Sequence, residues 1–515
     1  MTEKLGNRIA GSIEWPSGVD TIHSVNPARP AEVIAEIPDS GPDAVDRAVE
    51  AAAEAQRDWA KMPIPLRGEL IAACAAVLAQ RKPELSRLVA AEAGKVLVEA
   101  AGDVQEAIDM GWYVAGQGRG AWGETVPSEL SNKLCWTTRS PVGVVGMITP
   151  WNFPVAIPSW KIFPALLAGN SVVIKPSEKA PACAEAFVAA CVDAGVPAGL
   201  LNVVHGGARP AAAIAGHPGI RAVSFTGSVP TGRKVGAAAM ENGPRLISLE
   251  LGGKNAMVVL PSADLDLVAD GALFGAFGTA GQRCTSTSRL ILHRDIADRV
   301  LQTVAKRAGD LRLGDPLDDG IDVGPVIDAA SAARIEGMVS DAVEEGAELV
   351  TGGKRTEVAG CDGGSFFQPT ILSGVLASHH IAREEVFGPV LSVIEVDSAE
   401  EAIEVVNGTP YGLSAAVYTA ELAEAFHAVE QIDTGIVYVN APTIGAEIQL
   451  PFGGTRWTGN GYREAGRRGL EQFSETKTVY VDYSGRLQKA QIDTHPLDTD
   501  QRTPDLSPSA SPERA

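Results

Sequence analysis

Cys284 lies in the segment Gly281-Gln-Arg-Cys284-Thr-Ser, a polar stretch between a predicted helix and a predicted strand. The thiolate is the reactive form of cysteine, and a free thiol with a pKa of about 8.5 is only partly ionised at pH 7. The adjacent Arg283 supplies positive charge that would favour the thiolate. Taken alone, the segment fits a nucleophile and also a small buried apolar side chain.

Glu250 stands among apolar residues and before paired glycines, in Leu249-Glu250-Leu-Gly-Gly-Lys-Asn255. Burial would raise its pKa, which suits a general base that works near neutrality. A helix cap or a salt bridge is the alternative use of such a glutamate.

Asn152 belongs to Thr149-Pro-Trp-Asn152-Phe-Pro154, directly after the apolar, strand-like residues 143–148. The carboxyl ends of strands in an open α/β sheet face the ligand crevice. An amide there can donate a hydrogen bond to a developing oxyanion, and loss of such a donor slows reactions by about 10²–10³. The alternative is a turn made by the two prolines and Asn152.

Two further segments are suited to a dinucleotide. Phe225-Thr-Gly-Ser228 follows a strand-like stretch, and a Gly-Ser turn that opens a helix presents N–H groups to a pyrophosphate. Lys175 and Glu178 follow the strand-like residues 171–174, where they could bind the two hydroxyls of a ribose. The usual GxGxxG fingerprint is missing.

These residues must be positioned by alternating elements. Residues 43–62, 66–93 and 98–116 have helical periodicity, and short β-branched strands then alternate with helices. This alternation predicts two α/β regions with parallel sheets. The predicted strands are 143–148, 171–174, 201–204, 222–225, 256–260, 288–293, 390–395 and 415–418. The predicted helices between them are 182–194, 264–276, 296–309 and 330–345.

Composition narrows the class of protein. The 515 residues carry a formal net charge of −21, which disfavours nucleic acids and anionic membranes as partners. The N-terminus lacks the apolar run of a signal peptide, and no stretch has the length of a membrane span. From these two absences we predict a cytoplasmic location. The six cysteines form no CxxC pair or zinc-type cluster, so we predict no metal.

Residues 133–140 and 476–483 are strand-like and far apart in sequence. We expect them to form a small sheet that serves another subunit; a local hairpin cap is the alternative. After Tyr483 the chain becomes polar and contains four prolines, which predicts a disordered tail.

Taken together, these five segments resemble signatures of the aldehyde dehydrogenase superfamily. Glu385-Val-Phe-Gly-Pro389 and Pro451-Phe-Gly-Gly454 are similar to further motifs of that family, and the likeness runs from about Ser24 to Tyr483. The resemblance implies two parallel-sheet α/β domains, Rossmann-like and catalytic, with a bridging sheet that makes a homodimer or homotetramer. The implied parts are a cofactor domain (1–132 and 141–254), a catalytic domain (255–455), bridging elements (133–140 and 456–484) and the tail (485–515).

By that likeness, Cys284 attacks the aldehyde carbon, and the Asn152 amide with the Cys284 backbone N–H holds the oxyanion. Hydride passes to NAD, and Glu250 activates the water that hydrolyses the thioester. The implied cofactor-binding residues are Ile148, Thr149, Pro150, Trp151, Lys175, Ser177, Glu178, Gly227, Ser228, Gly232, Leu251, Glu385 and Phe387. A carboxylate at Glu178 would repel a 2′-phosphate, which favours NAD, although some relatives with this glutamate also use NADP.

The sequence constrains the identity of the substrate less than it constrains the fold or the cofactor. Arg283 could pair with a remote carboxylate, which would make the substrate a semialdehyde; pairing with a carboxylate of the protein is the alternative. The loop 440–450 is similar to that of aminoadipic and ketoglutaric semialdehyde dehydrogenases. Glu106 matches a glutamate that recognises the substrate amine in aminoadipic semialdehyde dehydrogenases. The other residues expected to line the tunnel through which the substrate enters are Phe153, Trp160, Ile444 and Phe452.

Three alternatives stay open. A general aliphatic or betaine-type aldehyde dehydrogenase would share all these motifs. Coenzyme-A-acylating relatives lack the hydrolytic glutamate, so Glu250 favours water as the acceptor. A non-catalytic homologue would be expected to lack Cys284 or Asn152, and both are present.

Overall fold

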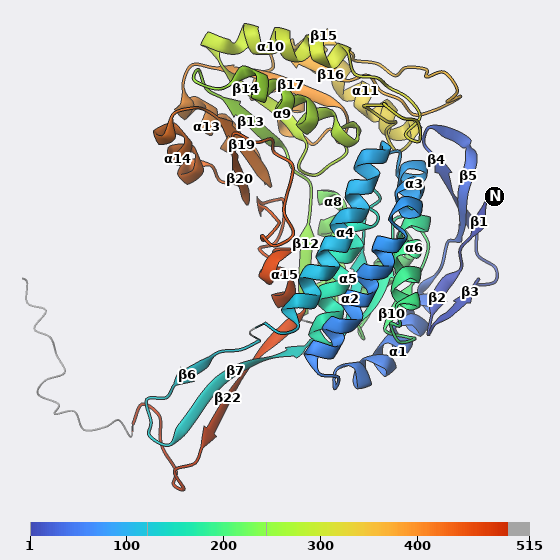
Figure 1. Cartoon of the computed structure of the whole chain (residues 1–515), viewed down its shortest axis with the longest axis vertical. Coiled ribbons are helices and arrows are strands. Elements are labelled where there is room, and N and C mark those ends of the chain that lie inside the picture. Colours follow the sequence, from blue (N-terminus) through green and yellow to red (C-terminus); the bar gives the residue numbers. More distant parts are fainter. Residues whose placement is uncertain (1, 121, 244, 493–515) are drawn as a thin grey trace, which may run out of the picture. The chain divides into compact units, whose positions relative to one another are not determined.

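The structure is a computed structural model that describes residues 2–120, 122–243 and 245–492. The chain divides into two compact units, Met1–Arg119 with Pro141–Ser474, and Gly120–Ser140 with Glu475–Ala515. Figure 1 gives the element labels used below. The part of the predicted disordered tail from residue 493 onward lies outside the described residues.

The first sheet of the large unit has seven strands in the order β12-β11-β8-β9-β10-β2-β3. Strands β8 to β12 run parallel, and β2 and β3 extend the edge antiparallel. Their bounds are β2 Asn7–Ile9, β3 Ser12–Glu14, β8 Val144–Ile148, β9 Ser171–Lys175, β10 Leu201–Val203, β11 Ala222–Thr226 and β12 Leu246–Glu250. The helices that accompany them are α1 Pro42–Trp59, α5 Ala156–Ala168, α6 Pro181–Asp193, α7 Ala208–Gly216 and α8 Val229–Glu241.

This strand order creates a switch point between β8 and β11. The chain runs from β8 to β9 and β10 in one direction, and then returns to the other side of β8 to form β11. Ligands of open α/β sheets bind at such a point, beyond the carboxyl ends of the strands. Those ends are Ile148 and Thr226, so the segments that follow them are placed for binding.

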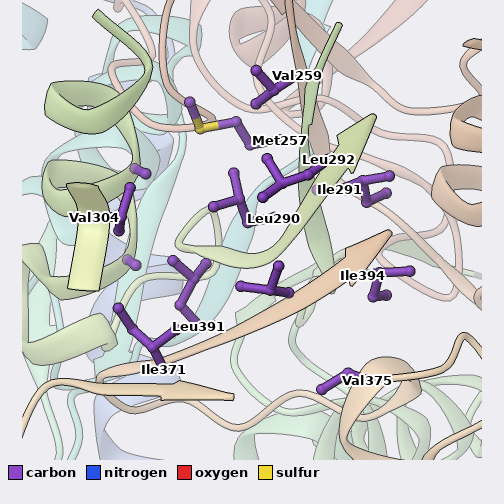
Figure 2. Close-up of a cluster of buried hydrophobic side chains, with 14 of the residues drawn as sticks. Met257, Val259, Leu290, Ile291, Leu292, Val304, Ile371, Val375, Leu391 and Ile394 are labelled. Atoms are coloured by element: carbon purple, nitrogen blue, oxygen red, sulfur yellow. The ribbon is translucent and has the colours of Figure 1, made fainter. Parts of the chain in front are cut away.

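The second sheet has the order β15-β16-β17-β14-β13-β19-β20, with only β15 antiparallel. Its strands are β13 Asn255–Val259, β14 Thr287–His293, β15 Glu348–Thr351, β16 Thr370–Ser373, β17 Val390–Val396, β19 Ser414–Tyr418 and β20 Ile436–Val439. Its helices are α9 Leu265–Phe277, α10 Arg294–Gly309, α11 Ala329–Glu344, α13 Ala399–Asn407 and α14 Leu422–Gln431. Figure 2 shows the apolar cluster that β13, β14 and β17 form, as expected for strands buried on both faces.

The predicted single helix over residues 66–93 is wrong. The structure has α2 (Ile64–Gln80) and α3 (Lys82–Ala93), which meet at Arg81. Pro83 stands at the start of α3, where its missing N–H is harmless, whereas it would break a continuous helix. Helix α4 (Leu97–Gln117) packs against α2, α3 and α5 (Figure 1).

The small unit contains a three-stranded sheet in the order β22-β7-β6. Its strands are β6 Thr125–Pro127, β7 Lys133–Pro141 and β22 Ser474–Asp482. The two distant strands predicted to pair therefore do so, with β6 as an additional edge. In the large unit, a three-stranded sheet in the order β1-β5-β4 completes the N-terminal region, with the strands β1 Glu3–Lys4, β4 Thr21–Asn26 and β5 Arg29–Pro38. Among the described residues, no helix is both long and apolar enough to cross a membrane.

Candidate active site

The loop that carries Cys284 is held in an unusual backbone conformation. It follows α9 through a short 3₁₀ turn in which Thr279, Ala280 and Gly281 all have positive φ. A side chain at Gly281 would collide with the carbonyl oxygen of Gly388, so the sequence needs glycine there. The Asn255 amide fixes the other end of the loop, because it donates to the Cys284 carbonyl oxygen at 2.8 Å.

The surroundings of Cys284 disfavour its thiolate. Burial and the carboxylates of Glu385 and Glu250 raise the pKa of Cys284 above its usual range, and the N–H groups of Cys284 and Thr285 lower it in part. The expected help from Arg283 is wrong, because its guanidinium is directed to Glu99, 3.4 Å away. The thiol therefore needs a base close to it.

Asn152 lies beyond the carboxyl end of β8 and is 4% exposed. Its amide nitrogen donates to the Gln282 carbonyl oxygen at 3.0 Å, two residues before Cys284. An amide has two N–H donors, so one remains for an oxygen at the reacting carbon. Asn152 and Cys284 line the same cavity.

Glu250 is the last residue of β12 and is 3% exposed. Neither carboxylate oxygen has a hydrogen-bond partner among the described residues. Burial and the negative charge of Glu464 raise the pKa of Glu250, and Lys161 and Arg463 oppose this shift. A buried carboxyl with a raised pKa and free oxygens suits a general base near neutral pH.

A buried ion pair lies behind Glu250. The Lys161 ammonium contacts the Glu464 carboxylate and donates to the Ser224 hydroxyl at 2.8 Å. Both charged side chains are fully buried, at 0% and 2% exposure. The sequence analysis missed this pair, because its members are 303 residues apart and neither stands in a recognisable motif.

A cavity of about 470 Å³ opens at the switch point of the first sheet. It reaches Cys284 from the side of α8, whose N-cap residue is Ser228. Seven of the predicted cofactor-binding residues line it: Pro150, Trp151, Gly227, Ser228, Leu251, Glu385 and Phe387. Residues that the sequence analysis missed also line it, among them Thr226, Lys179, Arg334 and Tyr411.

Glu385 is held in this cavity by backbone. The Gly253 N–H donates to its Oε1 at 3.2 Å, and a side chain at Gly252 would collide with its Oε2. Because Gly252 and Gly253 have no side chains, the Glu385 carboxylate can contact the backbone directly. Burial raises the pKa of Glu385 to about 7, opposed by the Gly253 N–H and by nearby cations.

The other six predicted cofactor residues are not part of the cavity wall. Lys175 ends β9, and its ammonium donates to Glu178 at 2.9 Å. The Thr149 N–H donates to the Lys175 carbonyl at 3.2 Å, which joins the ends of β8 and β9. A side chain at Gly232 would collide with Leu251. The predicted cofactor residues that do not line the cavity are Ile148, Thr149, Lys175, Ser177, Glu178 and Gly232.

These features fit a dinucleotide. The N-terminus of α8 offers free N–H groups to a pyrophosphate. Lys175 and Glu178 offer a donor and an acceptor to ribose hydroxyls, and the Glu385 carboxylate offers acceptors nearer to Cys284. The Thr149 hydroxyl is buried and has no partner among the described residues. The residues that the structure describes contain no group of His, Cys, Asp and Glu side chains that could hold a metal ion.

A second, smaller cavity of about 120 Å³ also reaches Cys284. Five of the six predicted substrate residues line it: Glu106, Phe153, Trp160, Arg283 and Phe452. The sixth, Ile444, is buried, and its neighbours Gly445 and Ala446 form the wall instead. The Trp160 and Phe452 rings pack edge to face with centroids 5.1 Å apart. The indole N–H of Trp160 has no partner among the described residues.

Charged residues surround the end of this cavity where Arg283 lies. The Arg283 Nε donates to the Thr279 hydroxyl at 2.9 Å. Lys95 pairs with Asp103 at 2.9 Å and stands over the Phe153 ring. Burial and the charge of Asp103 raise the pKa of Glu106 to about 8, and Lys95 and Arg283 oppose the shift.

Comparison with known proteins agrees with this geometry. The model of the aldehyde dehydrogenase family matches residues 15–479. The chain is 39% identical to an alpha-ketoglutaric semialdehyde dehydrogenase of Bacillus subtilis, over 90% of this chain and 95% of that protein. It is 40% identical to an alpha-ketoglutarate semialdehyde dehydrogenase of Haloferax volcanii, over 94% of this chain and 100% of that one.

Solved structures agree as well. The betaine aldehyde dehydrogenase of Staphylococcus aureus, crystallised with NAD⁺, superposes with a TM-score of 0.91. It is 32% identical, and the match covers 94% of this chain and 96% of that one. On the family match and on these relatives, the chain belongs to the aldehyde dehydrogenase family.

Proposed function

We propose that this aldehyde dehydrogenase, an NAD(P)-dependent oxidoreductase, forms a covalent intermediate on Cys284 and releases a carboxylic acid by hydrolysis. The observation that supports this most is the meeting of two cavities at one thiol. Asn152 lines the larger cavity and Glu250 the smaller one. A nucleophile, an oxyanion donor and a base are the groups that this chemistry needs.

In the proposed reaction, the Cys284 sulfur attacks the aldehyde carbon. Because the pKa of Cys284 is raised, the thiol proton needs an acceptor, and the Glu250 carboxylate, which lines the smaller cavity together with Cys284, takes it. The Asn152 amide and the Cys284 N–H donate to the resulting oxyanion. NAD(P)⁺ bound in the larger cavity would supply the hydride acceptor for this carbon, and loss of the hydride would leave a thioester on Cys284. Glu250 releases the thiol proton to solvent and then takes a proton from the water that attacks the thioester. The carbon–sulfur bond breaks as the acid leaves, and Glu250 returns this proton to the Cys284 sulfur, which restores the thiol.

Replacement of Cys284 by alanine tests this proposal. Cys284→Ala should abolish NADH formation from every aldehyde while leaving NAD binding intact, because the sulfur is the only group removed. Retained turnover would refute a covalent step on Cys284. Addition of coenzyme A to the unchanged enzyme separates the two acceptors: the free acid should remain the product, and acyl-coenzyme A formation would contradict the role of Glu250.

We further propose a semialdehyde with a remote carboxylate as the substrate. Two relatives named for ketoglutaric semialdehyde support this, as does the position of Arg283 on the wall of the smaller cavity. The guanidinium is held only loosely by Glu99, at 3.4 Å, so an incoming carboxylate could compete for it. A betaine-type aldehyde is the second candidate, supported by the NAD⁺-bound relative.

Two variants of this ion pair distinguish the candidates. Arg283→Leu should raise KM more for semialdehydes than for uncharged aldehydes. Glu99→Gln should lower KM for semialdehydes, because it frees the guanidinium while its amide oxygen can still accept from the Thr279 N–H. Equal effects on charged and uncharged aldehydes would reject the carboxylate role. Preference for a cationic aldehyde in the unchanged enzyme would favour the betaine-type alternative.

The preference between NAD and NADP and the bounds of the domains are also proposals. We favour NAD over NADP, because a carboxylate at Glu178 would repel a 2′-phosphate. We assign the cofactor domain to 1–132 and 141–254, and the catalytic domain to 255–455. The cytoplasmic location stays a prediction from the sequence.

We propose that the small unit mediates a homodimer or homotetramer. Its sheet carries large apolar side chains at the surface: Val126, Leu134, Tyr480 and Val481 are each between 41% and 65% exposed. Apolar side chains gathered on one exposed sheet are typical of a protein interface. Analytical ultracentrifugation tests this proposal. A monomer at micromolar concentration would contradict it, and Leu134→Glu with Tyr480→Glu should shift an oligomer toward monomer.

A further inference from the structure

Two carboxylates of α4 contact the two loops that carry the proposed catalytic residues. Glu99 and Asp103 are four residues apart in α4, so their side chains lie on the same face of the helix. Both are shielded from solvent, with side-chain exposures of 10% and 0%. Neither residue takes part in the proposed reaction, so their burial needs another explanation.

The first contact is with the loop that leads to Cys284. The Thr279 N–H donates to the Glu99 carboxylate at 2.8 Å, and the Arg283 Nε donates to the Thr279 hydroxyl at 2.9 Å. Thr279 and Ala280 both have positive φ, at 54° and 51°. Residues other than glycine, and β-branched ones above all, keep this conformation only where the surrounding structure imposes it. The Glu99 carboxylate is a group that can impose it, because it binds the backbone of the turn itself.

The second contact is with the loop that carries Asn152. That loop ends at Ala156, the first residue of α5, whose N–H donates to the Asp103 carboxylate at 2.7 Å. The first N–H groups of a helix have no partner within the helix, so a buried one needs an acceptor from elsewhere. The Lys95 ammonium donates to the other oxygen of Asp103 at 2.9 Å and so fixes the carboxylate. The start of α5, and with it the position of Asn152, therefore depends on α4.

We infer that Glu99 and Asp103 are positioning residues, which set the distance between the Cys284 loop and the Asn152 loop through the turn of α4 that joins them. This inference rests on the roles proposed for Cys284 and Asn152. The oxyanion needs a donor from each loop, the Cys284 N–H and the Asn152 amide, so the two loops must keep a fixed separation. A misplacement of about 1 Å in an active site can slow a reaction about 10²-fold.

Other contacts limit the effect of losing one carboxylate. The Asn152 amide donates to the Gln282 carbonyl oxygen at 3.0 Å, and the Asn255 amide donates to the Cys284 carbonyl oxygen at 2.8 Å. The Cys284 loop should therefore shift, and stay folded, when the Glu99 contact is lost. No described residue of α4 lines the larger cavity, so the affinity for NAD should not change.

The test compares alanine with the amide at position 99 of the full-length enzyme. Glu99→Gln keeps an oxygen that can accept from the Thr279 N–H, whereas Glu99→Ala removes it. The rate of the first NADH turnover is measured with an uncharged aldehyde, so that release of Arg283 has no carboxylate to act on. Glu99→Ala should lower this rate by about 10–10²-fold, and Glu99→Gln should retain most of it. Asp109→Ala is the matched control, because this exposed carboxylate of α4 contacts only Gln105 among the described side chains, and it should leave the rate unchanged.

A second pair of variants tests the Asn152 loop, and replaces the first if Glu99→Ala does not fold. Lys95→Met with Asp103→Asn removes both buried charges and keeps an acceptor for the Ala156 N–H. Lys95→Met with Asp103→Ala removes the acceptor as well. The rate of the first turnover should be about 10–10²-fold lower in the second double variant than in the first. Equal rates in the two would overturn the role of Asp103.

A double-mutant cycle with Asn152→Ala separates this inference from the proposal on which it rests. If Glu99 acts by placing the two donors, Glu99→Ala should slow the Asn152→Ala enzyme less than it slows the unchanged enzyme. Full additivity, or a parallel loss of NAD affinity, would assign Glu99 a purely structural role, against the inference. An unchanged rate in Glu99→Ala, or an equal loss in Glu99→Ala and Glu99→Gln, would overturn the inference alone. An unchanged rate in Asn152→Ala would instead overturn the oxyanion role of Asn152.

Discussion

Replacement of Asn152 by alanine should separate catalysis from stability. The side chain makes one hydrogen bond, to the Gln282 carbonyl oxygen at 3.0 Å, in a place that is 4% exposed. Loss of that bond should lower the free energy of unfolding by about 0.5–1.5 kcal/mol. Loss of the second N–H, proposed to hold the oxyanion, should lower kcat by about 10²–10³, equivalent to about 2.7–4 kcal/mol in the transition state.

The assay is a stopped-flow measurement of the first NADH turnover, with thermal denaturation alongside. Asn170→Ala is a matched control: Asn170 is fully buried, and its amide donates to the Ala165 and Phe473 carbonyl oxygens at 3.0 and 2.8 Å, outside both cavities. It should lose at least as much stability while retaining kcat. A drop in kcat of less than about threefold in Asn152→Ala, or an equal drop in Asn170→Ala, would refute the oxyanion role.

Further predictions concern the general base Glu250 and the buried carboxylate of Glu92 at the start of α6. Glu250→Gln should give a burst of NADH followed by a slow steady state, and full steady-state turnover would reveal another base. Because burial raises the pKa of Glu250, the ionised base is lost as pH falls through that raised value, so kcat should rise with pH toward neutrality; a kcat that is flat down to pH 5 would contradict this. Glu92→Ala should lower the free energy of unfolding by about 2–4 kcal/mol, because the Ala182 and Cys183 N–H groups that begin α6 would lose their acceptor. An unchanged melting temperature would show that water replaces the carboxylate.

The fold class and the family could be predicted from the sequence, and both are confirmed. The reason is that the needed patterns are local. Short β-branched runs mark buried parallel strands, and the Glu250 and Cys284 motifs are contiguous stretches that can be compared directly. The roles of individual site residues remain predictions, although Cys284 lines both cavities, Asn152 the larger one and Glu250 the smaller one.

The electrostatics of the site could not be predicted, because they come from partners far apart in the chain. Arg283 was expected to activate its neighbour, but its partner Glu99 is 184 residues away. Lys161 and Glu464 stand in separate elements and in no shared motif. Glu99 and Asp103 stand four residues apart in a predicted helix, but the loops that they contact are visible only in three dimensions.

The covalent step on Cys284 is tested most directly by mass spectrometry of the enzyme during turnover. Glu250→Gln is mixed with NAD and an aldehyde, quenched in acid and digested. The tryptic peptide that contains Cys284 should gain the mass of the acyl group, and the gain should vanish in the double variant that also carries Cys284→Ala. An unmodified peptide after a full burst of NADH, or an acyl group on another residue, would contradict the account.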